Sequence, residues 1–162
     1  MKKNFIKNRI KYASAIISVF LVSAIGSMIT NNGMDWYDNI NLPSFTPPGS
    51  FIGMIWTIIF ILATFSILFF LRKNKEVKEI RFQPILIFFI INGVLNIFWS
   101  TLFFGWGMLF WSIIEMAVLN ITTLILIVLL WKNNKASSIL LWPYFLWVSF
   151  ATYLAYNIWL LN

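Results

Sequence analysis

The chain has 162 residues, of which 60% are hydrophobic and only 10% are charged, whereas a soluble domain usually carries about a quarter charged residues. This composition excludes an ordinary soluble domain and indicates an all-α membrane protein. The chain has no cysteine and no histidine, which excludes disulfides, a zinc site, a Ser-His-Asp triad and a His-ligated haem built from this chain alone. We therefore expect no metal site.

The first predicted membrane helix follows a basic segment. Five Lys and Arg residues lie within residues 1–11, and an apolar run extends over about 12–30. A secretory signal peptide has a similar order of segments. Its apolar part is usually only ~7–15 residues long, and this chain stays hydrophobic afterwards. The pattern favours a retained transmembrane helix.

Residues 31–50 form the one long polar interruption between apolar runs. Pro43, Pro47 and Pro48 remove backbone donors and hold the residues before them extended, which predicts a non-helical strap from Trp36 onward. The segment carries two acids, several aromatic residues and no Lys or Arg. This makeup is typical of a loop packed over a pocket, so we interpret 31–50 as a lid.

Four further helices are predicted over about 51–71, 83–104, 108–131 and 139–161, within a single domain covering 1–162. Each is long enough to cross a bilayer, since ~20 residues at ~1.5 Å each span the ~30 Å hydrocarbon core. The five runs together predict a bundle of five transmembrane helices.

The residues at the ends of these predicted helices are typical of helix starts and turns. Ser50 can cap the second helix, and Pro84 suits the first turn of the third. Gly105, Trp106 and Gly107 form a very short turn, which predicts that the third and fourth helices are antiparallel neighbours. Pro143 falls in the first turn of the fifth helix or just beyond it, where a kink is tolerable.

The basic residues define a topology. Five helices place all twelve Lys and Arg on one side of the membrane, with five, five and two in the three segments there and none opposite. The positive-inside rule then predicts a cytoplasmic N-terminus and a C-terminus outside. Since the net charge of +7 is explained by topology, we expect no nucleic-acid binding.

A polar stripe runs along the third helix. Its residues recur at spacings of three and four, and they are Asn92, Asn96, Trp99, Ser100 and Phe103. Asparagine in hydrocarbon needs a partner, so the stripe should face other helices or a cavity. These residues either bridge neighbouring helices or line a ligand site, and the sequence leaves both readings open.

Two other helices supply candidates at a similar depth. Glu115 is the only acid within a predicted span. Because an intramembrane charge is costly, its carboxyl group is either protonated, or bonded to an asparagine of the third helix, or part of a functional site. Trp147 and Ala151 lie on one face of the fifth helix. Counted at ~1.5 Å per residue, Trp56, Asn96 and Glu115 lie about 6–12 Å inside the outer surface. We predict one pocket beneath the lid.

These residues give the chain a resemblance to a known family. It resembles the tryptophan-rich sensory protein family, also called the translocator protein or peripheral benzodiazepine receptor family. The resemblance covers about residues 12–162. The matching pieces are Trp36-Tyr37, Leu42-Pro43, Pro47-Pro48, Trp56, Asn92, Asn96, Trp99-Ser100, Phe103-Phe104, Pro143-Tyr144, Trp147, Phe150-Ala151, Trp159 and Leu161-Asn162.

The resemblance implies a five-helix bundle, commonly a homodimer, in a bacterial cell membrane. It also implies a receptor or sensor that binds porphyrins such as protoporphyrin IX, and benzodiazepine-type or isoquinoline ligands, in an outer pocket closed by the first loop. The candidate ligand-binding residues are Tyr37, Pro47, Trp56, Phe60, Asn96, Trp99, Ser100, Glu115, Trp147 and Ala151. No cofactor is expected apart from the porphyrin as ligand.

Other functions stay open. In bacterial relatives the positions matching Trp56 and Trp147 are associated with light-dependent porphyrin breakdown, so an enzyme is one alternative. A transporter of tetrapyrroles is another, and a structural bundle without a ligand is the simplest. Because the chain has no histidine to act as an axial ligand, we expect it to prefer the metal-free ring over haem.

Overall fold

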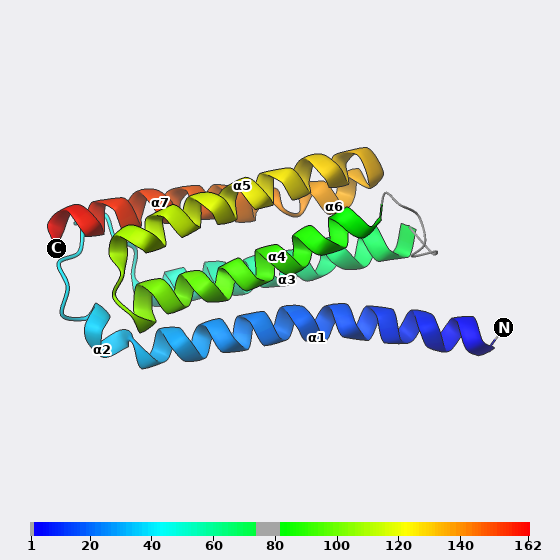
Figure 1. Ribbon diagram of the computed structural model, residues 1–162, viewed down its shortest axis with the longest axis horizontal. Helices are drawn as coiled ribbons and strands as arrows, with labels where there is room; N and C mark the ends of the chain where they lie inside the picture. The colour runs from blue at the N-terminus through cyan, green and yellow to red at the C-terminus, as the bar shows by residue number, and fades with distance from the viewer. Residues whose placement is uncertain (1, 74–81) are drawn as a thin grey trace.

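The computed structural model describes residues 2–73 and 82–162, with side chains from residue 9 onward. Within these ranges five helices are long and apolar enough to cross a membrane, and no strand is present. The prediction of an all-α membrane protein with five spans is therefore confirmed. Figure 1 shows the long helices running side by side along one axis.

The structure assigns eight helical elements to the described residues. They are α1 (Lys2–Asn32), α2 (Met34–Tyr37), α3 (Gly49–Lys73), α4 (Gln83–Ser100), the π-helix η1 (Thr101–Gly105), α5 (Leu109–Asn133), α6 (Lys135–Ile139) and α7 (Trp142–Leu161).

The helix α5 organises the packing. It contacts α4, α6, α7 and η1, while α1 packs against α3, α4 and η1, and α7 reaches α3. Since α4 and α5 run in opposite directions and pack together, the predicted antiparallel pair is confirmed (Figure 1). One side of α5 is buried along its whole length. Its buried residues recur every three or four positions and are Leu109, Ser112, Glu115, Met116, Leu119, Thr122, Thr123, Leu126, Ile127 and Leu130.

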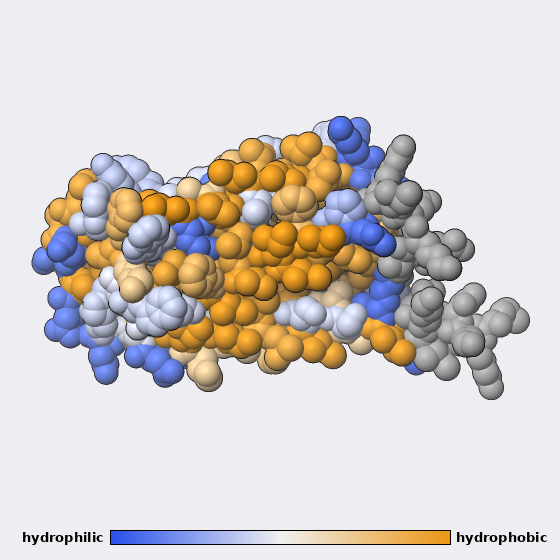
Figure 2. Space-filling model, in the orientation of Figure 1, coloured by the Kyte–Doolittle hydropathy of each residue, from blue (hydrophilic) through white to orange (hydrophobic). Residues whose placement is uncertain are grey.

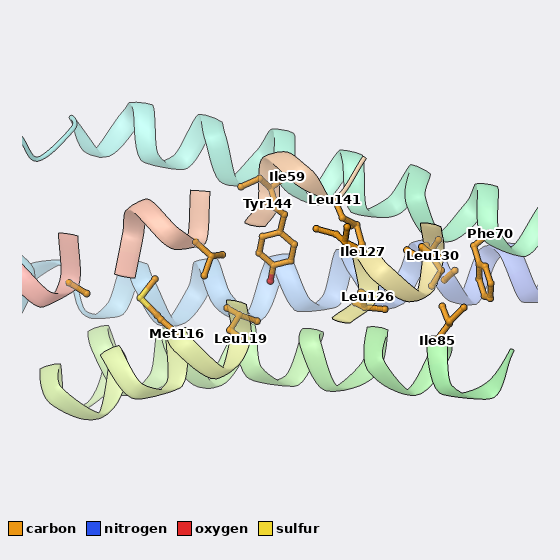
Figure 3. Packing of buried hydrophobic residues seen from close by; sticks show 14 of the residues in the cluster. Ile59, Phe70, Ile85, Met116, Leu119, Leu126, Ile127, Leu130, Leu141 and Tyr144 are labelled. Carbon is orange, nitrogen blue, oxygen red and sulfur yellow. The ribbon is translucent and has the colours of Figure 1, made fainter. Parts of the chain in front are cut away.

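The interior is apolar and so is much of the exterior. Figure 3 shows Tyr144 of α7 among buried side chains such as Leu119, Ile59 and Leu126. Figure 2 shows a broad apolar surface along the middle of the molecule, with hydrophilic residues gathered toward its two ends. An apolar belt between polar ends is what a bilayer requires.

The two ends of the bundle differ in charge. One end, which we call the basic end, holds Arg72 and Lys73 at the end of α3 and Lys132 and Lys135 near the junction of α5 and α6. The opposite end, which we call the lid end, holds α2, the loop to α3 and the end of α7 (Figure 1). Part of the second predicted basic cluster, residues 74–81, lies outside the described residues.

The lid differs from the predicted strap. Residues Met34–Tyr37 form the short helix α2, so the prediction that the strap is non-helical from Trp36 onward is wrong. Proline restricts only its own residue and the one before it, and Pro43 lies six positions beyond Tyr37. The next helix also begins at Gly49, so Ser50 lies inside its first turn and not at the predicted cap.

Two spans are irregular. The third span ends in η1, where the amide of Trp106 donates to the carbonyl of Thr101 five residues back, at 2.9 Å. The fifth span is divided, because α6 ends at Ile139 and α7 starts at Trp142 with Pro143 in its first turn. Proline is better tolerated in the first turn of a new helix than inside a continuous, kinked helix. An N–H group in the first turn would have no intrahelical partner in any case.

Candidate functional site

An aromatic stack forms the centre of the candidate site. The ring of Trp56 on α3 stacks on Phe60 at 5.7 Å and on Trp99 of α4 at 5.9 Å between centroids. Its third neighbour is Tyr144 of α7, in an edge contact at 6.1 Å. Three helices that are distant in sequence therefore bring their aromatic side chains together at one point.

The stack continues to the lid through η1. Trp99 stacks on Phe103 at 5.7 Å, and Phe103 meets Phe104 at 4.9 Å. From the lid, Trp36 contacts Phe103 at 5.6 Å and Tyr37 contacts Phe104 at 5.6 Å. Burial raises the pKa of Tyr37 above its ordinary range, and the charge of Asp38 adds to this. The lid is thus packed on aromatic rings.

A layer of amides lies beside the stack. The Nδ2 of Asn96 donates to the hydroxyl of Tyr144 at 3.2 Å, and the Nδ2 of Asn92 donates to the hydroxyl of Thr123 at 2.8 Å. The hydroxyl of Ser100 donates to the backbone carbonyl of Asn96 at 3.4 Å. Asn96 and Asn92 are only 4% and 7% exposed, so the polar stripe of α4 faces the bundle interior.

A cavity of about 430 Å³ opens next to this layer. It lies between α1, α3 and α4, with Tyr144 of α7 at one end and Lys11 of α1 toward the basic end. Of the ten candidate residues, Phe60 and Asn96 line it. The sequence analysis expected a pocket beneath the lid, whereas this cavity extends from the aromatic stack toward the basic end.

The candidates on α7 belong to a neighbouring group. Trp147 contacts Phe51 of α3 at 6.4 Å and Phe150 at 5.5 Å, and Ala151 is half-buried on the same helix. In the described part of the chain no ring contact joins Trp147 to Trp56. Pro47 is half-buried in the loop just before α3.

Glu115 lies apart from the cavity. It lines a groove of about 400 Å³ between α4 and α5, together with Phe98 and Trp111. Its side chain is 6% exposed, and neither carboxyl oxygen has a hydrogen-bond partner among the described residues. The indole N–H groups of Trp99 and Trp147 are also buried without a partner there. These unpaired groups leave hydrogen-bonding capacity for a ligand.

Two features of this region were not singled out as site residues from the sequence. Tyr144 joins the stack to the amides, and its position three residues before Trp147, on the same helical face, was the available signal. The lid is also tied to α7, since the Asn162 Oδ1 accepts from the Asn41 amide at 2.9 Å and its Nδ2 donates to the Asn41 carbonyl at 3.0 Å. Only the fold brings these two asparagines together.

The described residues offer no group of three or more His, Cys, Asp or Glu side chains that could hold a metal ion. The groups that the candidate site presents are aromatic faces, amides and hydroxyls. Such a site can stack on a flat apolar molecule and bond to its polar edge.

Comparisons with known proteins agree on one family. Residues 15–160 match the model of the TspO/MBR family. The chain is 36% identical over 152 residues to the tryptophan-rich protein TspO of Bacillus cereus, covering 92% of this chain and 97% of that protein. It is 33% identical to the tryptophan-rich protein TspO of Archaeoglobus fulgidus, covering 96% and 99%. The human translocator protein is 25% identical, with 83% and 80% covered.

Proposed function

Because this chain belongs to the TspO/MBR family, we propose that it is a membrane receptor or sensor for a flat hydrophobic ligand, with a porphyrin such as protoporphyrin IX first among the candidates. Benzodiazepine-type and isoquinoline molecules share the flat aromatic shape and belong to the same proposal. The protein is integral to the membrane, and we propose the cell membrane of a bacterium as its location and a homodimer as its form.

One observation carries this proposal. The rings of Trp56, Phe60 and Trp99 are stacked beside the buried amide of Asn96, at the end of a cavity of about 430 Å³. Ligand sites of this size are mostly apolar and contain a few polar groups that fix orientation. A macrocycle inserted against the indoles would gain stacking contacts, and the amide would meet its polar edge.

Titration of the purified protein with protoporphyrin IX, followed by tryptophan quenching, tests the proposal. We expect Trp56→Leu to weaken binding up to about tenfold, since an aromatic pair contributes ~0.5–1.5 kcal/mol and 1.4 kcal/mol is tenfold. The matched control is Trp111→Leu, because Trp111 is 59% exposed on the α4–α5 face. Equal affinity in the native protein and both variants would contradict the proposal.

The metal-free ring should be the preferred form. The chain has no histidine or cysteine to coordinate an iron atom strongly from the axial side. We expect haem to bind no more tightly than protoporphyrin IX in the same titration. A much higher affinity for haem would show that an axial ligand exists.

A second candidate function is light-dependent breakdown of the bound porphyrin. The observation that favours it is the contact of two electron-rich indoles, Trp56 and Trp99, at 5.9 Å. Illumination of the complex should then give a new chromophore with the native chain and not with Trp56→Phe or Trp147→Phe. Equal bleaching in all three proteins would leave binding as the function.

A further inference from the structure

Going beyond the proposed tetrapyrrole site, we propose that the groove between α4 and α5 binds a second class of ligand, a hydrophobic primary amine. Such a ligand has an apolar body and one ammonium group. The groove combines an unpaired carboxyl group, two exposed aromatic rings and apolar walls, and this combination defines the chemistry of the occupant.

The carboxyl group of Glu115 is the polar centre of the groove. Glu115 lines the groove and is only 6% exposed, and neither of its carboxyl oxygens has a hydrogen-bond partner among the described residues. An ionisable group within a membrane span is costly when it lacks a partner, and such a group is typical of a functional site. Glu115 is therefore an acid that a ligand can pair.

No cation of the described chain reaches Glu115. The sequence has no Lys or Arg in residues 12–71, 82–131 or 136–162, which hold nearly all of the five spans. Lys132 of α5 is ~25 Å further along the helix, at ~1.5 Å per residue. A second copy of the chain, parallel in the membrane, would bring no cation to this depth either. The ammonium group therefore comes from a separate small molecule.

Two aromatic rings line the groove together with Glu115. Trp111 lies one helical turn before Glu115 on α5, where side chains four residues apart are neighbours. Phe98 belongs to α4. The two residues are 59% and 43% exposed, so their rings are accessible to a ligand. The face of an aromatic ring attracts an ammonium group. Rings beside a carboxyl group therefore favour a cationic ligand.

The two unpaired oxygens of Glu115 favour an amine over an alcohol. A primary ammonium group has three N–H donors and can bond to both oxygens of a carboxylate, whereas a hydroxyl group has one donor. Hydrogen bonds between charged groups are also about twice as strong as neutral ones. Both oxygens are covered in this structure, so binding turns the carboxyl group about its side-chain bonds toward the ammonium group.

The position of Glu115 favours a free amine over a phospholipid. Glu115 lies six residues beyond Leu109, where α5 begins near the lid end, so it is ~9 Å along the helix (Figure 1). The amine of a phospholipid stays in the headgroup layer, outside the hydrocarbon core. The apolar residues Leu95, Ile114 and Val118 line the groove of about 400 Å³ and would contact the apolar body of the ligand.

The test titrates the full chain in a nonionic detergent at pH 7 with dodecylamine and with dodecyltrimethylammonium. Binding is followed by calorimetry, with the signal of protein-free micelles subtracted. Both probes carry the same chain and charge, but only the amine has N–H donors. We expect dodecylamine to bind at least about tenfold more tightly, because one hydrogen bond to a charged group contributes that much. Equal binding, or tighter binding of dodecyltrimethylammonium or of dodecanol, would overturn the proposal.

Variants assign the effect to the groove. Glu115→Gln keeps the size of the side chain and should abolish the preference for dodecylamine. Trp111→Leu should weaken dodecylamine binding about 2- to 5-fold, since it removes one cation–π contact. If Glu115→Gln does not fold, Val118→Phe serves instead, because it fills the groove and should weaken binding. The matched control is Val128→Phe, at an exposed position of α5 outside the groove. Equal effects of these two valine variants would overturn the proposal, as would a preference retained in Glu115→Gln.

Two tryptophan variants separate this inference from the tetrapyrrole proposal. Trp56→Leu should weaken the binding of protoporphyrin IX and leave dodecylamine binding unchanged, because Trp56 does not line the groove. Trp111→Leu should have the opposite effects. Dodecylamine binding that is weakened by Trp56→Leu and unaffected by Trp111→Leu would overturn the inference, whatever the porphyrin result.

Discussion

Gly33 joins the end of α1 to α2 at a point where no side chain fits. A Cβ atom at this position would collide with the backbone carbonyl oxygen of Phe104 in η1. Backbone cannot move aside as the end of a flexible side chain can. The glycine therefore allows the lid to turn directly against η1, which holds the aromatic rings beneath it.

We expect Gly33→Ala to destabilise the protein by about 1–3 kcal/mol, the usual cost of forcing extra volume into a packed contact. The matched control is Gly53→Ala, because nothing lies within 4 Å of a Cβ at Gly53 in α3. That change should stabilise by up to ~1 kcal/mol through helix propensity. Thermal unfolding in detergent measures both, and equal melting temperatures would contradict the expectation.

Tyr37 should make lid closure sensitive to alkaline pH. Its pKa is raised above the ordinary 10.0 in the closed lid, chiefly by burial. Between the two values the closed lid holds more protons than the open one, so closure weakens as pH rises above about 10 and is unaffected below it. The absorbance difference between native protein and Tyr37→Phe should titrate above pH 10, and a transition at or below that value would contradict the burial argument.

At the scale of elements, the lid is held at two places. At the α2 end its rings pack on η1, and near the middle of the lid the backbone of Asn41 exchanges two hydrogen bonds with the side chain of Asn162. Phe45 also stacks on Tyr153 of α7 at 5.6 Å. Opening the lid therefore means detaching it from α7, since the α2 end is fixed by packing.

We expect Asn162→Ala to increase lid opening, because it removes two hydrogen bonds to Asn41 that contribute ~0.5–1.5 kcal/mol each. Hydrogen exchange of the lid amides should become about 10-fold faster, and ligand dissociation should accelerate with it. Asn157→Ala is the control, since within the described residues the side chain of Asn157 donates to the carbonyl of Tyr153 in its own helix and makes no bond to the lid. Unchanged exchange in Asn162→Ala would show that ring packing, together with the remaining bond from Asn41 Nδ2 to the Leu161 carbonyl at 3.3 Å, is enough to hold the lid.

The sequence predicted the existence of the five spans because each needs only a long apolar run. It did not predict α2, the π-helix or the division of the last span. These depend on local hydrogen bonds, such as the one from Trp106 to Thr101, and on contacts such as Gly107 against the Trp36 indole. Gly107 has φ +62°, and a Cβ there would lie 3.2 Å from the ring.

At the scale of the whole molecule, the charges give an orientation that can be measured. We expect the basic end in the cytoplasm and the lid end outside. The chain has no native cysteine, so Ser44→Cys in the lid and Lys135→Cys at the basic end provide unique labels at exposed positions. A membrane-impermeant maleimide should label Ser44→Cys on intact cells and Lys135→Cys only after permeabilisation. The reverse pattern would invert the topology.

Part of the candidate site could be predicted from the sequence. Helical periodicity placed Asn92, Asn96 and Ser100 on one inward face, and all three are buried. The cavity beside them was not predictable, because its volume depends on how far α1 stands from α3 and α4. Periodicity says which face of a helix is apolar and says nothing about the distance between two helices.

The sparse burial of α1, where Ala15 and Gly26 are the buried residues among the described side chains, also bears on how this protein can evolve. The buried stripe that stabilises the bundle belongs to α5, whereas α1 supplies one wall of the cavity and faces the bilayer with most of its surface. Substitutions on that wall can change the shape of the cavity without disturbing the packing of the helices that keep the molecule folded. If the proposed site binds a ligand, selection for a different ligand would therefore act first on α1.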